Sequence, residues 1–491
     1  MTKSPLEQKV IFAILISSIL LSAIQYIYNR SLWLDEAVLA LNIINKNSFQ
    51  LLQPLDYNQV APVLFLQIEK LFSFIIPNSE YGLRLFPLLC FWASLYFFYK
   101  IIKLLFTDSY TIIFALSLFV FNSTLIYYSN EVKQYMGDVL VLTAIYSLVL
   151  QTDKREKDKY YLLCIAGTVS IFISNAAPII LFSTGMYILY NNIKNKRPGF
   201  KYIAAVFSIW LISFLVYYYC FIHQHPTKDI MIDYWSDAKA FMPANPFTKG
   251  FYEFLFSKFK MMFTSLLNFN YIGLYCLSFL FFAGYILTRK RKKTGVTLLL
   301  LLPILLHLLL SAFKLYPFDE RLVLYLCPII IIAIAFGFNY LKEYIFHISK
   351  IERSRLLLIF VPFIFLIIFF TNSFPIKNEE IKTSLSYIKN NMQANDNIYV
   401  YYSAIPAFTY YTDIKFFHIS SPIIKGSSNR GNKELYITEL QNCTGRTWLL
   451  FTHIYGKEEN YIVERLDTLG YSKTEVFNNK GTSAYLYYFG E

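Results

Sequence analysis

The sequence predicts an α-helical polytopic membrane protein with about eleven membrane-spanning helices, followed by a small C-terminal α/β domain. Hydrophobic residues make up 56% of the 491 residues and charged residues only 16%, whereas about 25% of the residues in soluble proteins are charged. The formal net charge is +13, but the basic residues cluster between apolar runs and form no stripe on a polar domain. We therefore expect membrane lipids, and no nucleic acid, among the partners.

Long apolar runs recur along the first 374 residues. A further stretch, from Tyr160 to Tyr190, is interrupted by Ser174, Asn175 and Pro178, so it predicts two short helices joined by a tight turn. No small-residue cleavage site follows the first run, which we interpret as a retained helix and not as a signal peptide. The runs long enough to cross a bilayer are 10–28, 83–105, 111–128, 134–150, 202–222, 271–288, 296–313, 322–340 and 355–372.

The orientation follows from Lys and Arg in short loops, because cationic side chains beside a helix end are retained in the cytoplasm. Four loops are strongly basic, and alternation of the spans places all four on the side of the N-terminus. The first loop and the C-terminal domain then face outward, in a multi-pass protein of the cell membrane, which we expect to be the bacterial cytoplasmic membrane. The basic loops are 151–160, 191–201, 289–293 and 341–355.

Two segments outside the spans have a pattern of their own. In the first extracytoplasmic loop, 29–82, apolar residues recur at helical spacing between Leu64 and Ile75, which predicts an amphipathic helix. This helix either lies in the membrane interface or packs on other protein. Domain 1–374 is followed by a polar domain, 375–491, in which helix-like segments alternate with the β-rich runs NIYVYYS, RTWLLFTHI and SAYLYYFG.

The sharpest chemical signal is the pair of adjacent carboxylates in Trp33-Leu34-Asp35-Glu36, just beyond the first span. Acidic residues at that depth are costly unless they are used or solvated. The pair is therefore either functional or the end of a helix in interfacial water. The histidines His307, His418 and His453 are expected to be structural and not ligands.

Charged residues also gather near the outer ends of other spans. Cationic side chains where a lipid phosphate enters would suit anion binding, because a guanidinium can pair with two phosphate oxygens. The alternative for each is that it extends to the lipid headgroups. These residues are Arg84, Glu131, Lys133 and Arg321.

The order of these segments resembles the GT-C fold glycosyltransferases that use polyprenyl-phosphate sugars, the group of protein O-mannosyltransferases and lipid A aminoarabinose transferase. SLWLDEA resembles the acidic motif of that family, and YNQVAPVLFLQIEKL with NSEYGLRLFPLL resembles its interfacial helix and the entry to the second span. YYSNEVKQYMGDVLV, YPFDERLVLYLCP and the tail segment IYVYYSAIPAFTYY also have counterparts. Where members often have His-Pro-Pro, this chain has Val60-Ala61-Pro62.

The resemblance implies an inverting transfer of a sugar from a polyprenyl-phosphate carrier to an envelope lipid, glycan or protein acceptor on the outer face. It makes Asp35 the candidate base. Glu36 would position Asp35 or, together with it, hold a divalent cation such as Mg²⁺ or Mn²⁺. The phosphate-side candidates are Arg321, Arg84 and Lys133, and the candidate acceptor- or donor-site residues are Glu131, Tyr57 and Asn58.

Two other classes of function remain open. A transporter or flippase of lipid-linked sugars would also have many spans, but it should place ionisable residues or broken helices near the midplane, often with internal repeats. A non-catalytic assembly factor for envelope glycans would use the C-terminal domain as a binding module.

The predicted orientation can be tested with a reporter fused after Glu491. A reporter that is active only in the cytoplasm should stay silent, because the basic loops fix the other side of the membrane as cytoplasmic. A fusion after Lys293, in the basic loop 289–293, is the matched control and should be active. Strong activity of the Glu491 fusion would mean that a span is miscounted, first of all within 160–190.

Overall fold

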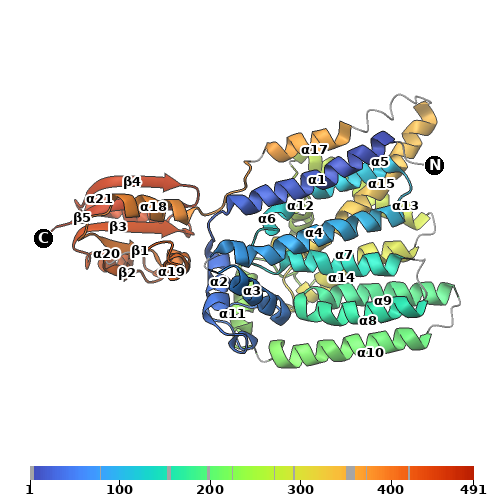
Figure 1. The fold of residues 1–491 in the computed structure, drawn as a ribbon, viewed down its shortest axis with the longest axis horizontal. Coiled ribbons are helices and arrows are strands. Elements are labelled where there is room, and N and C mark those ends of the chain that lie inside the picture. The colour runs from blue at the N-terminus through green and yellow to red at the C-terminus, as the bar shows by residue number, and fades with distance from the viewer. Residues whose placement is uncertain are drawn as a thin grey trace. The chain divides into compact units, whose positions relative to one another are not determined.

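The structure, a computed structural model, shows two compact units, each formed by segments that are distant in the sequence (Figure 1). The first unit comprises Met1–Tyr26, Ser48–Glu69 and Arg84–Asn372, and the second comprises Ile27–Asn47, Lys70–Leu83 and Ser373–Glu491. Two segments of the first loop thus belong with the C-terminal residues. The described residues are 5–77, 79–151, 156–195, 200–223, 225–269, 271–290, 294–349, 360–371, 373–418 and 421–490.

The first unit is helical. Five of the described helices are long and apolar enough to cross a membrane, and four shorter helices are also apolar. Many of their large apolar side chains are exposed, as lipid-facing side chains are, so this is a membrane protein. The count of eleven spans stays a prediction. The helices are α1 (Pro5–Tyr28), α4 (Glu80–Leu105), α5 (Ser109–Val120), α6 (Ser123–Tyr128), α7 (Tyr135–Leu150), α8 (Glu156–Ile173), α9 (Ala177–Lys194), α10 (Phe200–Tyr217), α11 (Lys228–Asp237), α12 (Lys249–Thr264), α13 (Tyr271–Lys290), α14 (Thr294–Ala312), α15 (Cys327–Ser349) and α17 (Val361–Phe370).

Most predicted spans correspond to these helices. The predicted pair of helices within 160–190 is confirmed by α8 and α9, which are separated by three residues. The single helix expected over 111–128 is wrong, because the chain breaks at Asn122 into α5 and α6. The Asn122 side chain accepts a hydrogen bond from the Leu125 amide at 3.1 Å and so caps α6. Parts of all four basic loops lie outside the described residues.

The span expected over 322–340 begins differently and is longer. It starts as a seven-residue 3₁₀-helix, η3 (Glu320–Leu326), and continues as α15 to Ser349. Pro328 is the second residue of α15, and proline is accepted in the first turn of a helix but not inside one. A 3₁₀ run of this length is uncommon.

Two glycines allow α13 and α15 to pack closely. A Cβ atom on Gly284 would lie 1.9 Å from the carbonyl oxygen of Ala333, and one on Gly337 would lie 2.0 Å from that of Leu280. Small residues at such a crossing let two helix backbones touch, as in other membrane helix pairs. The contact fixes α15, and with it η3 at its start.

The second unit is built on a five-stranded sheet of order β2-β1-β3-β5-β4. Strands β1, β2 and β3 are parallel, whereas β5 is antiparallel to both β3 and β4. Large side chains such as Trp448, Tyr399 and Tyr487 fill its core. Its elements are α2 (Leu34–Asn45), α18 (Ile381–Asn391), β1 (Asn397–Val400), α19 (Ile405–Asp413), β2 (Ile423–Lys425), α20 (Glu434–Leu440), β3 (Gly445–Thr452), α21 (Glu458–Thr468), β4 (Ser472–Asn479) and β5 (Thr482–Phe489).

The predicted α/β character of the tail is therefore confirmed. The three β-rich runs form β1, β3 and β5, while β2 and β4 were not predicted. The amphipathic helix of the first loop is α3 (Val63–Ile75). Its first half buries Phe65 and Leu66, and its second half exposes Phe74 and Ile75, so the helix packs on protein at one end and presents apolar side chains at the other.

Candidate active site

The acidic motif opens helix α2. Asp35 and Glu36 lie in its first turn, where the partial positive charge of a helix N-terminus stabilises carboxylates. At the other end, the Lys70 ammonium donates to the carbonyl oxygens of Ile43 and Ile44, at 2.8 and 3.1 Å. These bonds satisfy carbonyl groups that have no partner within the helix. Helix α2 thus has negative side chains at its N-terminus and a positive side chain at its C-terminus, as the helix dipole favours.

Glu36 is fully buried and forms an ion pair with Arg30. The Nη1 atom of Arg30 lies 2.5 Å from Oε2 of Glu36, and both side chains are almost inaccessible to solvent. Arg30 also donates to the carbonyl oxygen of Ser31 at 3.3 Å. The ion pair of Glu36 with Arg30 therefore fixes the segment before α2.

Asp35 differs from Glu36 in burial. It is only partly buried, and it lies near enough to His453 to affect the titration of that imidazole. The indole ring of Trp33 also packs on His453, with 5.9 Å between ring centroids. The acidic motif thus contacts, through Trp33, a side chain of the C-terminal residues.

A second group of contacts holds residues 29–32, which lead into the motif. The Lys382 ammonium donates to the Asn29 carbonyl at 2.5 Å and pairs with Glu80 at 2.9 Å. The Tyr411 hydroxyl donates to Glu80 at 2.9 Å and accepts from the Leu32 amide at 2.8 Å. The approach to Asp35 is therefore held from both sides of the first loop and from the C-terminal domain.

A divalent cation shared by Asp35 and Glu36 does not fit this geometry. Glu36 is buried and already neutralised by Arg30, and a cation there would have to displace a guanidinium. Among the described residues, no group of three or more His, Cys, Asp and Glu side chains could hold a metal ion. As the two carboxylates are placed in this structure, they therefore do not fit a shared metal ion.

The phosphate-side candidates lie in the first unit. Arg84, Glu131 and Lys133 are all buried. The Lys133 ammonium donates to the Gln59 side-chain oxygen at 2.7 Å. Gln59 follows Tyr57 and Asn58, which both have left-handed backbone conformations and are exposed. The turn at 57–58 therefore brings the first loop to Lys133.

Arg321 lies on η3, and its guanidinium is 5.4 Å from the ring centroid of Trp235 on α11. Helix η3 packs against α7, and Glu131 and Glu320 both lie near Tyr128. The loop before η3 is anchored by His307, whose two ring nitrogens bond to the Tyr325 hydroxyl and the Pro317 carbonyl at 3.0 and 2.9 Å. His307 is thus structural, as expected, and the predicted charges before α7 and on η3 share one end of the unit.

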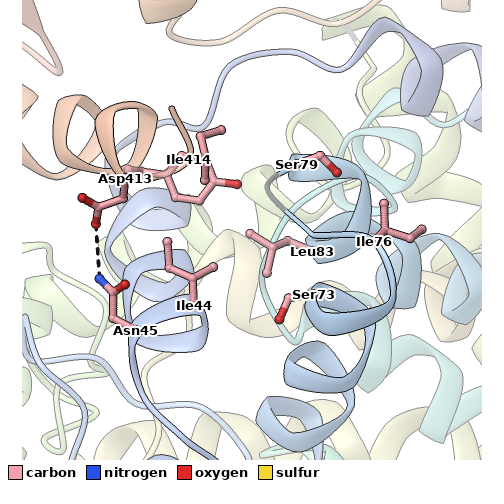
Figure 2. Close-up of a pocket in the computed structure, with 9 residues that line it drawn as sticks. Ile44, Asn45, Ser73, Ile76, Ser79, Leu83, Asp413 and Ile414 are labelled. Atoms are coloured by element: carbon pink, nitrogen blue, oxygen red, sulfur yellow. Dashed lines mark hydrogen bonds between the residues drawn. The ribbon is translucent and has the colours of Figure 1, made fainter. Parts of the chain in front are cut away.

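The second unit also has an open pocket of about 170 Å³ between α2, the start of α4 and the end of α19 (Figure 2). Asn45 and Asp413 meet across one wall at 3.3 Å. Ser73 and Leu83 face them from the other wall. None of the predicted site residues lines this pocket.

Several residues around the motif were not predicted. One of them, Arg30, had a usable signal, because it is the only basic residue between Lys9 and Lys46 and a buried carboxylate requires a cation. The others are hundreds of residues away in sequence, and nothing local connects them with the motif. They are Glu379, Lys382, Tyr411 and His453.

Comparison with solved structures identifies the class of fold. The crystal structure of ArnT from Cupriavidus metallidurans bound to undecaprenyl phosphate covers 97% of both chains with a TM-score of 0.52 and 10% sequence identity. The apo structure of the same protein gives 0.53, at the same coverage and identity. The chain therefore has the GT-C fold, as the sequence predicted.

The sequence also places the chain in a family. Residues 61–338 match the family described as "Domain of unknown function (DUF6311)", and the chain belongs to that family. No curated protein matches the sequence.

The Arg30–Glu36 pair gives a stability prediction. Arg30→Met should lower the melting temperature of the detergent-solubilised protein strongly, because losing one partner of a buried ion pair costs about 3–5 kcal/mol. The double variant Arg30→Met, Glu36→Leu should recover most of that loss, since no charge stays buried alone. Lys249→Met, which removes an exposed partner of Glu253, is the control and should change little. A melting temperature of Arg30→Met equal to that of the control would contradict the inferred pairing.

Proposed function

We propose that this chain is an inverting glycosyltransferase that moves a sugar from a polyprenyl-phosphate carrier to an envelope lipid, glycan or protein on the outer face of the membrane. The observation that carries the proposal is the position of Asp35 in a GT-C fold. Of the two adjacent carboxylates it is the one that is only partly buried, whereas Glu36 is buried in an ion pair with Arg30. The undecaprenyl phosphate bound by ArnT is a polyprenyl phosphate, the kind of carrier that the proposed donor would release.

In the proposed reaction an acceptor hydroxyl attacks the anomeric carbon of the sugar. The bond between that carbon and the phosphate oxygen breaks, and the polyprenyl phosphate leaves with the electron pair. Asp35 accepts the hydroxyl proton, as a general base. Because attack and departure occur on opposite faces, the anomeric configuration inverts. The position of Asp35 at a helix N-terminus favours the ionised carboxylate that this role requires.

The negative charge that develops on the leaving phosphate needs cationic partners. We assign this role to Arg321, Arg84 and Lys133, with Arg321 first. A guanidinium can form two parallel hydrogen bonds with a phosphate, and an ammonium acts as a point charge. Glu131, Tyr57 and Asn58 remain candidates for contacts with acceptor or donor.

Mass spectrometry of envelope lipids, glycans and glycoproteins from cells with and without the gene should identify the sugar and the acceptor. Purified protein should then release sugar from the corresponding radiolabelled polyprenyl-phosphate donor. A transporter or flippase would move the donor across vesicles without cleaving it, and an assembly factor would do neither. An unchanged donor in the presence of the acceptor would refute the proposed reaction.

Asp35→Asn should reduce transfer by at least ~10²-fold, the contribution commonly assigned to a general base. Asn is nearly isosteric and keeps hydrogen bonds, but it cannot accept the proton. Turnover should be measured per monodisperse, detergent-solubilised molecule. Asp158→Asn, at an exposed position on α8, is the matched control. If Asp35→Asn turned over at the rate of that control, the search for the base would move to Glu131 or to the acidic residues of 223–270.

Arg321→Lys should impair transfer nearly as much as Arg321→Ala, because Lys cannot reproduce a bidentate contact with phosphate. Donor KM and kcat should be measured for both variants. Arg465→Lys, which alters a half-exposed ion pair with Glu434 on the second unit, is the control and should behave like wild type. Retention of most activity by Arg321→Lys would show that the residue acts as a point charge or a membrane anchor.

A further inference from the structure

His453 is held in an unusual backbone conformation. It directly follows β3 and has a φ of +51°, in the left-handed region that only a few per cent of residues other than Gly adopt, His, Asn and Asp more often than the rest. The Ser403 hydroxyl bonds to the carbonyl oxygens of Thr452 and His453, at 2.9 and 3.0 Å. Such conformations persist only where the surroundings determine them, and they cluster at functional sites.

The imidazole is oriented by a carboxylate that is itself fixed. Nδ1 of His453 lies 2.7 Å from Oε1 of Glu379. Glu379 is 8% exposed, and its other oxygen accepts from the Thr452 hydroxyl at 3.2 Å. The bond to Glu379 places the proton on Nδ1 and sets the plane of the ring, as carboxylates do for histidines in catalytic and metal sites.

The imidazole ring also contacts the acidic motif. The Trp33 indole packs on the ring at a centroid distance of 5.9 Å and an interplanar angle of 39°. Trp33 immediately precedes α2, and Asp35 is the second residue of that helix. Contact with His453 therefore restricts the start of the helix that carries the candidate base.

The charges around the ring favour its protonated form. Burial lowers the pKa of His453, but the hydrogen bond and negative charge of Glu379 and the negative charge of Asp35 outweigh that effect. Arg430 acts in the opposite direction, and the pKa of His453 is raised overall. An imidazolium ion would in turn favour the ionised form of Asp35, because the interaction between two charges is reciprocal.

We propose that His453, held by Glu379, is a positioning residue for Asp35, which it orients through Trp33 and supports as an ionised carboxylate. This role rests on the proposed transfer reaction. His453 itself transfers no proton to the substrate. The C-terminal domain would then be part of the catalytic apparatus and not a separate binding module.

The kinetic test is the pH dependence of kcat/KM for wild type, His453→Gln and Glu379→Gln. Asp35 must be ionised to act, so activity falls on the acidic side as it is protonated. Loss of the imidazolium should move that acidic limb upward by about one pH unit, within the range of effects of a neighbouring opposite charge. His418→Gln, at an exposed position of the same unit, is the control and should leave the limb in place. An acidic limb of His453→Gln identical to wild type would overturn the proposed role, whatever the loss of stability.

A second measurement does not depend on activity. Diethylpyrocarbonate modifies neutral imidazole, so its reaction with His453 between pH 5 and 8, followed by mass spectrometry, reports the titration of that side chain. Asp35→Asn and Glu379→Gln should each move the modification profile of His453 to lower pH, and the profile of His418 in the same samples should not move. A His453 profile unaffected by Asp35→Asn would overturn the coupling, even if the purified protein transferred no sugar. A shifted profile without any transfer would support the coupling and refute the proposed reaction instead.

Discussion

The buried ion pair between Arg30 and Glu36 is the interaction on which the geometry of the acidic motif depends. A carboxylate without solvent must be paired, because the cost of removing its charge from water is several kcal/mol. Successive residues of a helix differ by about 100° in direction, so Asp35 and Glu36 cannot occupy the same environment. Because Arg30 holds the Glu36 side chain in the interior, the Asp35 side chain lies on a different face of the helix and is only partly buried. The pair thus gives two chemically similar residues different surroundings, because one is buried in an ion pair and the other is partly exposed.

The segment before the motif has no secondary structure of its own between Tyr28 and Leu34. Ordering such a segment costs conformational entropy, which contacts with other parts of the chain must offset. Lys382 and Tyr411 supply the contacts, together with Glu80 at the end of the first loop. Through Lys382 and Tyr411 the C-terminal domain therefore restricts the segment that leads to Asp35.

Sequence reasoning succeeded where the signal is local and failed where it is not. Apolar periodicity revealed most helices and the buried strands β1, β3 and β5. An element with a buried face has apolar residues at regular spacing along the chain, and this spacing can be read from the sequence. Strand β4, SKTEVFNN, lies at the edge of the sheet, and edge strands carry polar residues that hide the alternation. Strand β2 has only three residues, too few to show a period.

The candidate site was predicted in the same uneven way. Asp35 stood out because a carboxylate near the membrane needs a reason. The sequence left a metal at Asp35 and Glu36 open, because it does not show that Arg30 pairs with Glu36. His453 was expected to be structural and Glu379 was not singled out, since the contacts that connect them with the acidic motif exist only after the chain has folded.

The topology of the sheet explains why His453 lies where it does. Strands β1 and β3 are adjacent and parallel, so the residues that follow them, including Ser403 and His453, emerge at the same edge. The connection from β1 runs to β2 on one side, and the chain returns to β3 on the other. This reversal is the switch point at which α/β sheets characteristically place functional groups. In this chain the group at the switch point contacts Trp33, one residue before the helix that carries Asp35. Other α/β sheets use this position to bind a ligand. In this chain the residue at this position, His453, instead contacts the acidic motif of the first loop.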